Sequence, residues 1–298
     1  VWRPRNFSRG AVAAMAEEPA GRRSSSRGAA VAMAEEPTPP PSTYLPPPPL
    51  LAAGALGGPF VIASLTPLRN AMSNAAQDQA SSLAGLYRRA FGSPTLAVAS
   101  RLRVGFTGAL VSAPAACPQW CVIGPAFHVL HSVLPTPAAL LGTATLETFI
   151  TFGSQTRNAQ MAYNVQAPTA SVPLSNIVRP WGPGAPFFVL RNFCGMAGIR
   201  WLSPPIQRAL EPAVPSGPRE LLSDMAASML TCVVSAPLNS CWSYIVTTPS
   251  LWELSAAERA RTLGPFLRRQ YLDASGWPSR LAVRDLSVRC VYIACCFS

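Results

Sequence analysis

The chain has 298 residues, of which 49% are hydrophobic and only 12% are charged, and its formal net charge is +11. Soluble domains carry about twice that charged share, so the composition argues against an ordinary water-soluble protein and favours one embedded in a membrane. All 24 basic residues are arginines, and they are scattered between apolar runs. This scatter argues against a nucleic-acid partner and favours contact with anionic, cardiolipin-like membrane lipid.

Residues 1–47 are predicted to form a disordered, low-complexity extension rich in proline. The segment SRGAVAAMAEEP (8–19) recurs as SRGAAVAMAEEP (26–37), and the run PTPPPSTYLPPPP (37–49) follows it. Such a composition buries too little apolar surface to offset its ordering entropy, and the prolines favour a polyproline II spacer. Its arginines and serines suit an organelle transit peptide, but its four glutamates are atypical of one, so both readings stay open.

Six apolar stretches follow this extension. Residues 50–68 and 221–247 approach the roughly 20 apolar residues that a membrane-spanning helix needs. The other four are shorter or interrupted by arginine: 101–114, 138–153, 185–202 and 281–297. Polar residues inside a spanning helix are expected where the helix lines a water-filled cavity. We therefore predict an all-α membrane protein with six transmembrane helices, in which the proline-rich residues 115–137 form either a loop or a re-entrant element.

Two interleaved sets of three similar segments indicate an internal repeat. In the first set, SLTPLRNAMSNA, ITFGSQTRNAQMA and VSAPLNSCWSYI are centred on Pro67, Gly153 and Pro237, which lie 86 and 84 residues apart. In the second set, a proline precedes an apolar stretch and then an arginine, at Arg101, Arg191 and Arg284. A single shared proline would mean little in a chain with 32 of them, but two sets in phase favour a threefold repeat.

This pattern resembles the mitochondrial carrier family, and the stretch AAGALGGPFVIASLTPLRNAMSNAAQ (52–77) carries the resemblance best. The family has three tandem repeats, each with two membrane helices, and a proline kinks each odd-numbered helix. The resemblance therefore implies three pseudo-symmetric two-helix repeats at about residues 48–115, 136–206 and 219–298, within a carrier-like membrane domain over 48–298. It also implies that Pro67, Gly153 and Pro237 mark the helix kinks that close the matrix end.

The resemblance implies a substrate site as well. Arg101, Arg191 and Arg284 would point toward one axis, and Asn192 would accompany Arg191 at the contact point of the fourth helix. Guanidinium groups around a cavity attract anions and bind carboxylate or phosphate bidentately. The alternative for these arginines is that they extend from helix ends to lipid phosphates.

The sequence departs from the family at every acid–base motif. The family places an acidic residue two positions after the proline and a basic residue three positions later. The corresponding pairs here are Arg69 with Met72, Gln155 with Asn158, and Asn239 with Trp242. Without these ion pairs, closure of the matrix end requires other contacts, or the protein does not cycle.

Two functional hypotheses follow, and a third discards the resemblance. The first is a divergent carrier that exchanges a small anionic metabolite across the mitochondrial inner membrane by alternating access. The second is a carrier fold without transport activity, which serves as an accessory subunit of a larger mitochondrial membrane complex. The third is a generic multi-helix membrane protein.

No enzymatic chemistry is predicted. Catalytic triads, phosphate loops and paired carboxylates do not emerge from the sequence. The eight cysteines are interpreted as free thiols, since several lie inside apolar runs. His128 and His131 are interpreted as packed or interfacial side chains, because no third metal ligand accompanies them. The sequence therefore predicts neither a metal site nor a cofactor.

Overall fold

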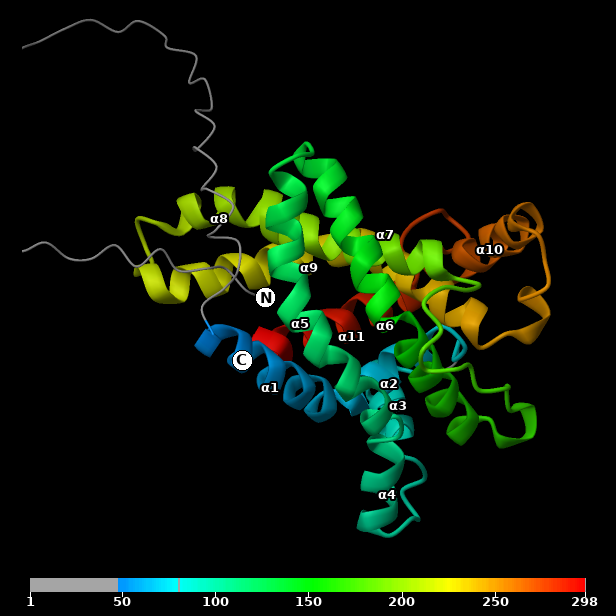
Figure 1. The fold of residues 1–298 in the computed structure, drawn as a ribbon. Coiled ribbons are helices and arrows are strands. Elements are labelled where there is room, and N and C mark those ends of the chain that lie inside the picture. Colours follow the sequence, from blue (N-terminus) through cyan, green and yellow to red (C-terminus); the bar gives the residue numbers. More distant parts are fainter. Residues whose placement is uncertain (1–47, 80, 298) are drawn as a thin grey trace, which may run out of the picture.

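The computed structural model describes residues 48–79 and 81–297, and this part of the chain is helical without a β-strand (Figure 1). The prediction of an all-α protein is confirmed for these residues. The predicted extension at 1–47, with its duplicated segment, lies outside them.

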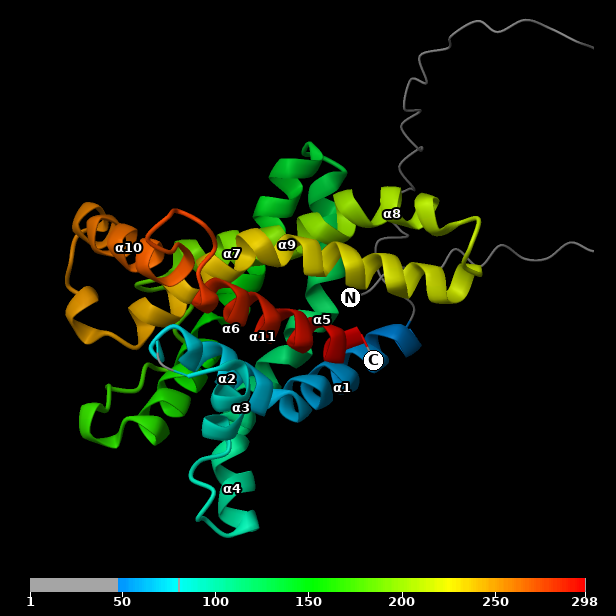
Figure 2. The ribbon, with the colours of Figure 1, turned by 180° about the vertical axis from the view of Figure 1, so that it is seen from behind.

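Seven helices form a ring in which each contacts the next, and α2 closes the ring by contacting α11 (Figures 1 and 2). In contact order these helices are α1 (Pro48–Ser64), α5 (Ala109–His131), α6 (Thr136–Gln166), α7 (Ala185–Ala197), α9 (Ser216–Val246), α11 (Arg280–Phe297) and α2 (Thr66–Ala75). Because α1 and α2 are consecutive segments bent by 57° at Leu65, the ring contains six helical units. Three of them, α2, α6 and α9, also contact one another directly.

Shorter helices connect the members of the ring. They are α3 (Leu83–Ala90), α4 (Val98–Gly105), η2 (Pro168–Ala170), the π-helical turn η3 (Gly198–Leu202), α8 (Ser203–Leu210), η4 (Pro249–Leu251) and α10 (Ala256–Tyr271). Helix α10 begins with a capping box, in which Ser255 and Glu258 satisfy each other's backbone N–H groups. Helix α4 projects away from the ring (Figure 1).

By length and apolar composition, α9 is the helix among the described residues that can cross a membrane by itself. Two pairs of consecutive helices also pass this test when each pair is taken together: α1 with α2, bent by 57°, and α4 with α5, bent by 40°. If each bent pair is one span, the described residues contain up to three candidate spans. Membrane association is therefore compatible with the structure.

The polarity of α9 is inverted relative to a helix in a water-soluble protein. Leu230, Val233 and Val234 are 58%, 64% and 58% exposed, whereas Asn239 and Ser243 on the same helix are buried. Exposed apolar side chains over a polar interior are expected of a helix that meets lipid on one face and a polar cavity or helix contact on the other.

Most of the proline-rich region 115–137 lies in one continuous helix, and a short turn at 132–135 follows it. Helix α5 runs from Ala109 to His131 and contains Pro114, Pro118 and Pro125, so 115–131 is not a loop, and α5 with α4 forms a bent pair that fits a broken span or a re-entrant element. The stretch predicted at 101–114 is divided instead, because Gly108 has φ +83° and separates α4 from α5. Only glycine adopts this backbone conformation readily, so the α-helical run ends there.

We expect Gly108→Ala to destabilise the protein by more than 1–2 kcal/mol, the approximate cost of left-handed backbone for a residue with a Cβ atom. The added Cβ would also lie 2.8 Å from Cγ of Asn158, which is held by a neighbouring helix. Thermal unfolding in detergent would measure the loss. Gly217→Ala is the matched control, because apart from its chain neighbours and its own helix backbone no described atom lies within 4 Å of its added Cβ. An equal loss in both variants would contradict the prediction.

Candidate functional site

A cavity of about 350 Å³ lies inside the ring of helices. Its lining residues come from α1, α2, α5, α6, α7, α9 and α11, and from the π-helical turn η3. On α6, Leu140, Thr143, Glu147 and Gln155 line it in succession. At 1.5 Å per residue these positions extend over about 22 Å, so the cavity is elongated along α6.

One end of this cavity is strongly basic. Arg69 from α2, Arg191 from α7 and Arg289 from α11 all line it, and we call these three residues the arginine floor. Glu147 is the one carboxylate among the described lining residues, and its Oε1 accepts a hydrogen bond of 2.6 Å from Nε2 of Gln119. The fixed charges near the floor therefore leave a positive surplus, which favours an anionic ligand.

Arg69 is the least compensated member of the floor. Its side chain is buried, with 5% exposure, and Nη1 has no hydrogen-bond partner among the described residues. A buried guanidinium without a partner is costly, so such a residue is expected where a ligand supplies the missing acceptor.

Arg191 is held in place by uncharged groups. Its Nη1 donates to Oδ1 of Asn239 at 3.0 Å, and its Nε and Nη2 donate to Oδ1 of Asn192 at 3.2 and 2.9 Å. The guanidinium carbon lies 3.9 Å from the ring centroid of Phe188 and 5.4 Å from that of Trp242. These contacts orient the charge without neutralising it, because cation–π contacts and amide acceptors leave the net charge unchanged.

Arg289 completes the floor with a similarly neutral environment. Its Nε donates to Oγ of Ser235 at 3.0 Å, and its Nη1 lies 3.6 Å from Sδ of Met72. The guanidinium therefore remains available for a stronger, charged acceptor.

The three arginines predicted from the repeat are not brought together. Arg191 lines the cavity with Asn192, whereas Arg101 lies on α4, outside the lining residues. Arg284 also lies outside them. In its place Arg289, one and a half turns further along α11, reaches the cavity.

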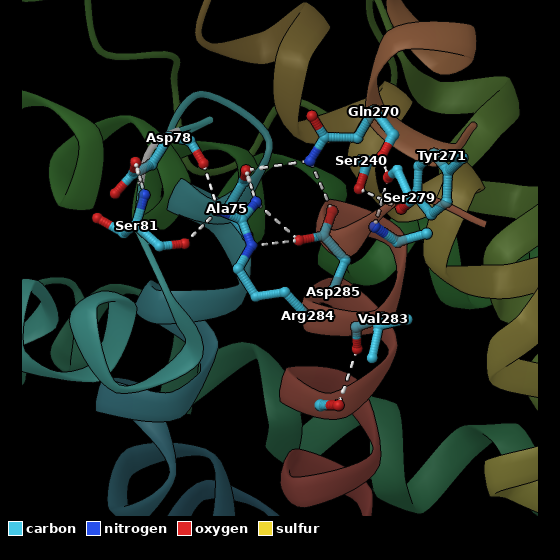
Figure 3. A network of polar contacts seen from close by, with 12 residues as sticks. Ala75, Asp78, Ser81, Ser240, Gln270, Tyr271, Ser279, Val283, Arg284 and Asp285 are labelled. Carbon is cyan, nitrogen blue, oxygen red and sulfur yellow. Dashed lines mark hydrogen bonds and ion pairs between the residues drawn. The ribbon is translucent and has the colours of Figure 1, made fainter. Parts of the chain in front are cut away.

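Arg284 serves instead to hold the end of α2 (Figure 3). Its guanidinium donates to the carbonyl of Ala75 at 2.8 Å, to that of Ser81 at 3.0 Å and to that of Asp78, and it forms an ion pair of 2.9 Å with Asp285. A basic side chain is favourable here because the last carbonyls of a helix lack internal partners.

Asp285 also accepts a hydrogen bond of 2.8 Å from Nε2 of Gln270, near the loop after α10. Burial, and secondarily the charge of Asp285, raises the pKa of the Tyr271 phenol, which shares a hydrogen bond of 2.8 Å with Ser240. Tyr271 is therefore protonated at neutral pH. The same network fixes this end of α11 and engages the guanidinium of Arg284, so that its donors are not available to a ligand in the cavity.

The three predicted kink positions have different surroundings. Pro67 lies in the first turn of α2, immediately after the 57° bend. Pro237 lies inside α9, which continues to Val246. Gly153 lies inside the continuous α6, where an added Cβ would be 2.6 Å from the carbonyl oxygen of Arg179. Glycine is thus required there by the close approach of the loop before α7.

Beyond the arginine floor, side-chain amides join α2, α6 and α9, or the residues that directly follow α2 and α9, in three pairs. Nδ2 of Asn158 donates to Oδ1 of Asn70 at 3.2 Å, and Nε2 of Gln160 donates to the carbonyl of Val246 at 3.1 Å. Nε2 of Gln77 completes the set by donating to Oγ1 of Thr247 at 2.7 Å and of Thr248 at 3.1 Å. We call these contacts the amide triangle; they hold the three helices together without ion pairs.

Sequence reasoning missed two members of the floor. In the sequence Arg69 stands only as a departure from the acid–base motif, and Arg289 lies outside the threefold pattern. The available signal for Arg69 was its charge close to Pro67, in a segment that was expected to be embedded in the membrane.

Comparison of the chain with protein-family models, with curated proteins and with solved structures finds no match. Function is therefore inferred from the cavity and its surroundings.

Proposed function

We propose that the chain is a divergent, mitochondrial-carrier-like transporter that exchanges a small anionic metabolite by alternating access. The observation that carries this proposal is the arginine floor, with buried Arg69 lacking a partner at Nη1, inside a cavity surrounded by six helical units. Binding sites of carriers need charge that is oriented and uncompensated until the substrate arrives.

We further propose that the six helical units span the mitochondrial inner membrane as three two-helix repeats. The three odd-numbered units in this arrangement are α1 with α2, α6, and α9, and the amide triangle joins them at one end. This triangle supports closure of that end without the ion pairs of the family. Alternating access then requires these neutral hydrogen bonds to break and re-form.

Reconstituted exchange tests the transport proposal. Purified protein in liposomes loaded with a mixed set of carboxylates and inorganic phosphate is expected to take up a labelled anion only when an internal anion is present. Arg191→Gln is expected to lower this uptake at least tenfold, because it removes a charged donor from the floor. Exchange by the variant at the normal rate would contradict the proposal.

The membrane position of α9 gives a separate prediction. Val234→Arg, on the exposed apolar face, is expected to cost about 2.5–3.5 kcal/mol of insertion free energy if this residue is near the bilayer centre. The fraction of the variant protein that resists alkaline extraction from source membranes would fall. Fractionation of mitochondria would show whether the unaltered protein is in the inner membrane. Ser250→Arg, at an exposed position outside the helices of the ring, is the control; equal extraction of both variants would place α9 outside the bilayer.

The alternative function is that of an accessory subunit without transport activity in a larger membrane complex. The observation that favours it is the amide triangle itself. Neutral hydrogen bonds, in place of ion pairs at the motif positions, would also suit a ring of helices that stays closed at this end and does not transport. Native electrophoresis in mild detergent separates the two functions: migration near the mass of the chain supports a transporter, and migration with a large complex supports the accessory role.

A further inference from the structure

The cavity has two chemically different zones. The arginine floor lies toward the amide triangle, since Arg69 directly precedes Asn70 on α2, and Asn70 accepts a hydrogen bond from Asn158. Toward the opposite end the lining is mainly apolar and comes from five elements: Ile123 and Phe127 on α5, Leu140 on α6, Met196 on α7, Ile199 on η3, and Ile293 on α11. Arg200 on η3 also lines this zone, and its guanidinium carbon lies 4.5 Å from the ring centroid of Phe127. A ligand with its negative charge on the arginine floor would therefore place the rest of its body among apolar side chains and against the Arg200–Phe127 pair.

Glu147 lies between these zones. It is on α6 two turns from Gln155 on one side and two turns from Leu140 on the other, and Gln119 is hydrogen-bonded to its Oε1. A second carboxylate on the ligand, a few atoms from the first, would meet this side chain. Like charges at such separations repel strongly where water is scarce, so a dicarboxylate is disfavoured.

The volume of the cavity limits the size of the ligand. About 350 Å³ is at the lower end of the range of roughly 300–1,000 Å³ found for small-molecule pockets, which favours a small ligand.

We propose that the cavity binds a small amphiphilic monocarboxylate, with the carboxylate on the arginine floor and an aromatic or branched apolar body against the apolar zone. This inference rests on the proposed function, because it concerns the ligand of the same cavity. The unpartnered Nη1 of Arg69 supplies a donor for the carboxylate, and Arg191 and Arg289 supply further charge. Glu147 acts as a specificity residue that rejects a second negative charge.

Binding to the full chain, purified in detergent, tests the inference with phenylpyruvate as the probe and malate and ADP as competitors. Phenylpyruvate is expected to bind at least tenfold more tightly than malate, because the burial of one aromatic ring favours it by more than that factor. ADP is expected to compete poorly for the same reason as malate, since it carries more than one negative charge. Tighter binding of malate or ADP than of phenylpyruvate would overturn the inference.

Two variants with matched controls assign the zones. Glu147→Gln is expected to raise malate affinity at least tenfold and to change phenylpyruvate affinity less than threefold, whereas Glu253→Gln, at an exposed position outside the cavity, changes neither. Ile123→Thr is expected to weaken phenylpyruvate severalfold without affecting malate, whereas Val122→Thr, on the exposed side of α5, has no effect. An unchanged malate affinity in Glu147→Gln would overturn the role of this residue.

The ligand class and the transport proposal fail in different ways. Binding of phenylpyruvate with the expected variant pattern, but without exchange in liposomes, would refute transport and support the ligand class. Exchange of malate in preference to phenylpyruvate would refute the ligand class and support transport. Absence of binding by every probe would refute the ligand class directly.

Discussion

Arg69→Met is expected to raise the unfolding temperature of the protein while lowering anion binding at least tenfold. Arg69 is buried and its Nη1 has no described partner, so an apolar side chain of similar volume removes an unfavourable buried charge. Replacing buried charges in this way stabilises other proteins by about 1–4 kcal/mol. The same change removes a charged hydrogen-bond donor, which contributes about 1.5–3 kcal/mol to the binding free energy of a carboxylate. This loss corresponds to a decrease in affinity of at least about tenfold.

Thermal unfolding in detergent, with and without phenylpyruvate, measures both effects on one sample. The wild-type protein is expected to be stabilised by the ligand and the variant much less. Arg101→Met is the control, because Arg101 lies outside the cavity and its loss leaves binding unchanged. If Arg69→Met lowered the unfolding temperature and left binding intact, Arg69 would be a structural residue.

The second large effect is expected at the amide triangle. Gln160 is fully buried, and its side chain bonds to the carbonyl of Val246, to the hydroxyl of Ser175 and to the backbone N–H of Ser175. Gln160→Met keeps the volume but leaves these groups unpaired, at about 1–3 kcal/mol for each buried group. We expect a total loss of about 2–4 kcal/mol, which lowers the unfolding temperature by roughly 4–16 °C.

Gln155→Met controls for the change in chemistry, because Gln155 is on the same helix and lines the cavity. The control is expected to alter the unfolding temperature by less than 2 °C, in line with substitutions away from buried networks. Raising the salt concentration should leave the difference between the two variants unchanged, since neutral hydrogen bonds are not screened as ion pairs are. A strong dependence on salt would indicate that ionic contacts close this end.

The helical class of the fold could be predicted from apolar stretches and proline spacing, but the register of α11 could not. Arg284 and Arg289 are five residues apart, which places them about 140° apart around a helix. One therefore contacts the end of α2 and the other lines the cavity. Recurrence at the repeat spacing selected Arg284, because a repeat pattern contains no information on which face of the helix meets the cavity.

The middle of the chain shows a similar limit. Three prolines in 109–131 suggested an interruption, yet neighbouring helices on both sides hold α5 continuous. Gly153 aligns with two prolines, so the sequence predicts a kink there. In the structure α6 is continuous at Gly153, and the close backbone of the loop before α7 explains why this residue is glycine. In both cases tertiary contacts that are distant in sequence determine the local structure, and single-sequence patterns do not contain them. Arg191 was predictable because its position and its polar neighbour Asn192 occur together.

The bonds from Arg284 to the end of α2 join segments more than 200 residues apart, so they order the steps by which the protein forms. During synthesis α2 emerges early, and its terminal carbonyls must wait for α11. Contacts of such long separation are entropically costly to close and are expected to form late. Until then the ring is open between its first and last members, and Arg289 has not reached the cavity. A chaperone or the lipid itself would have to shield the basic interior during that interval.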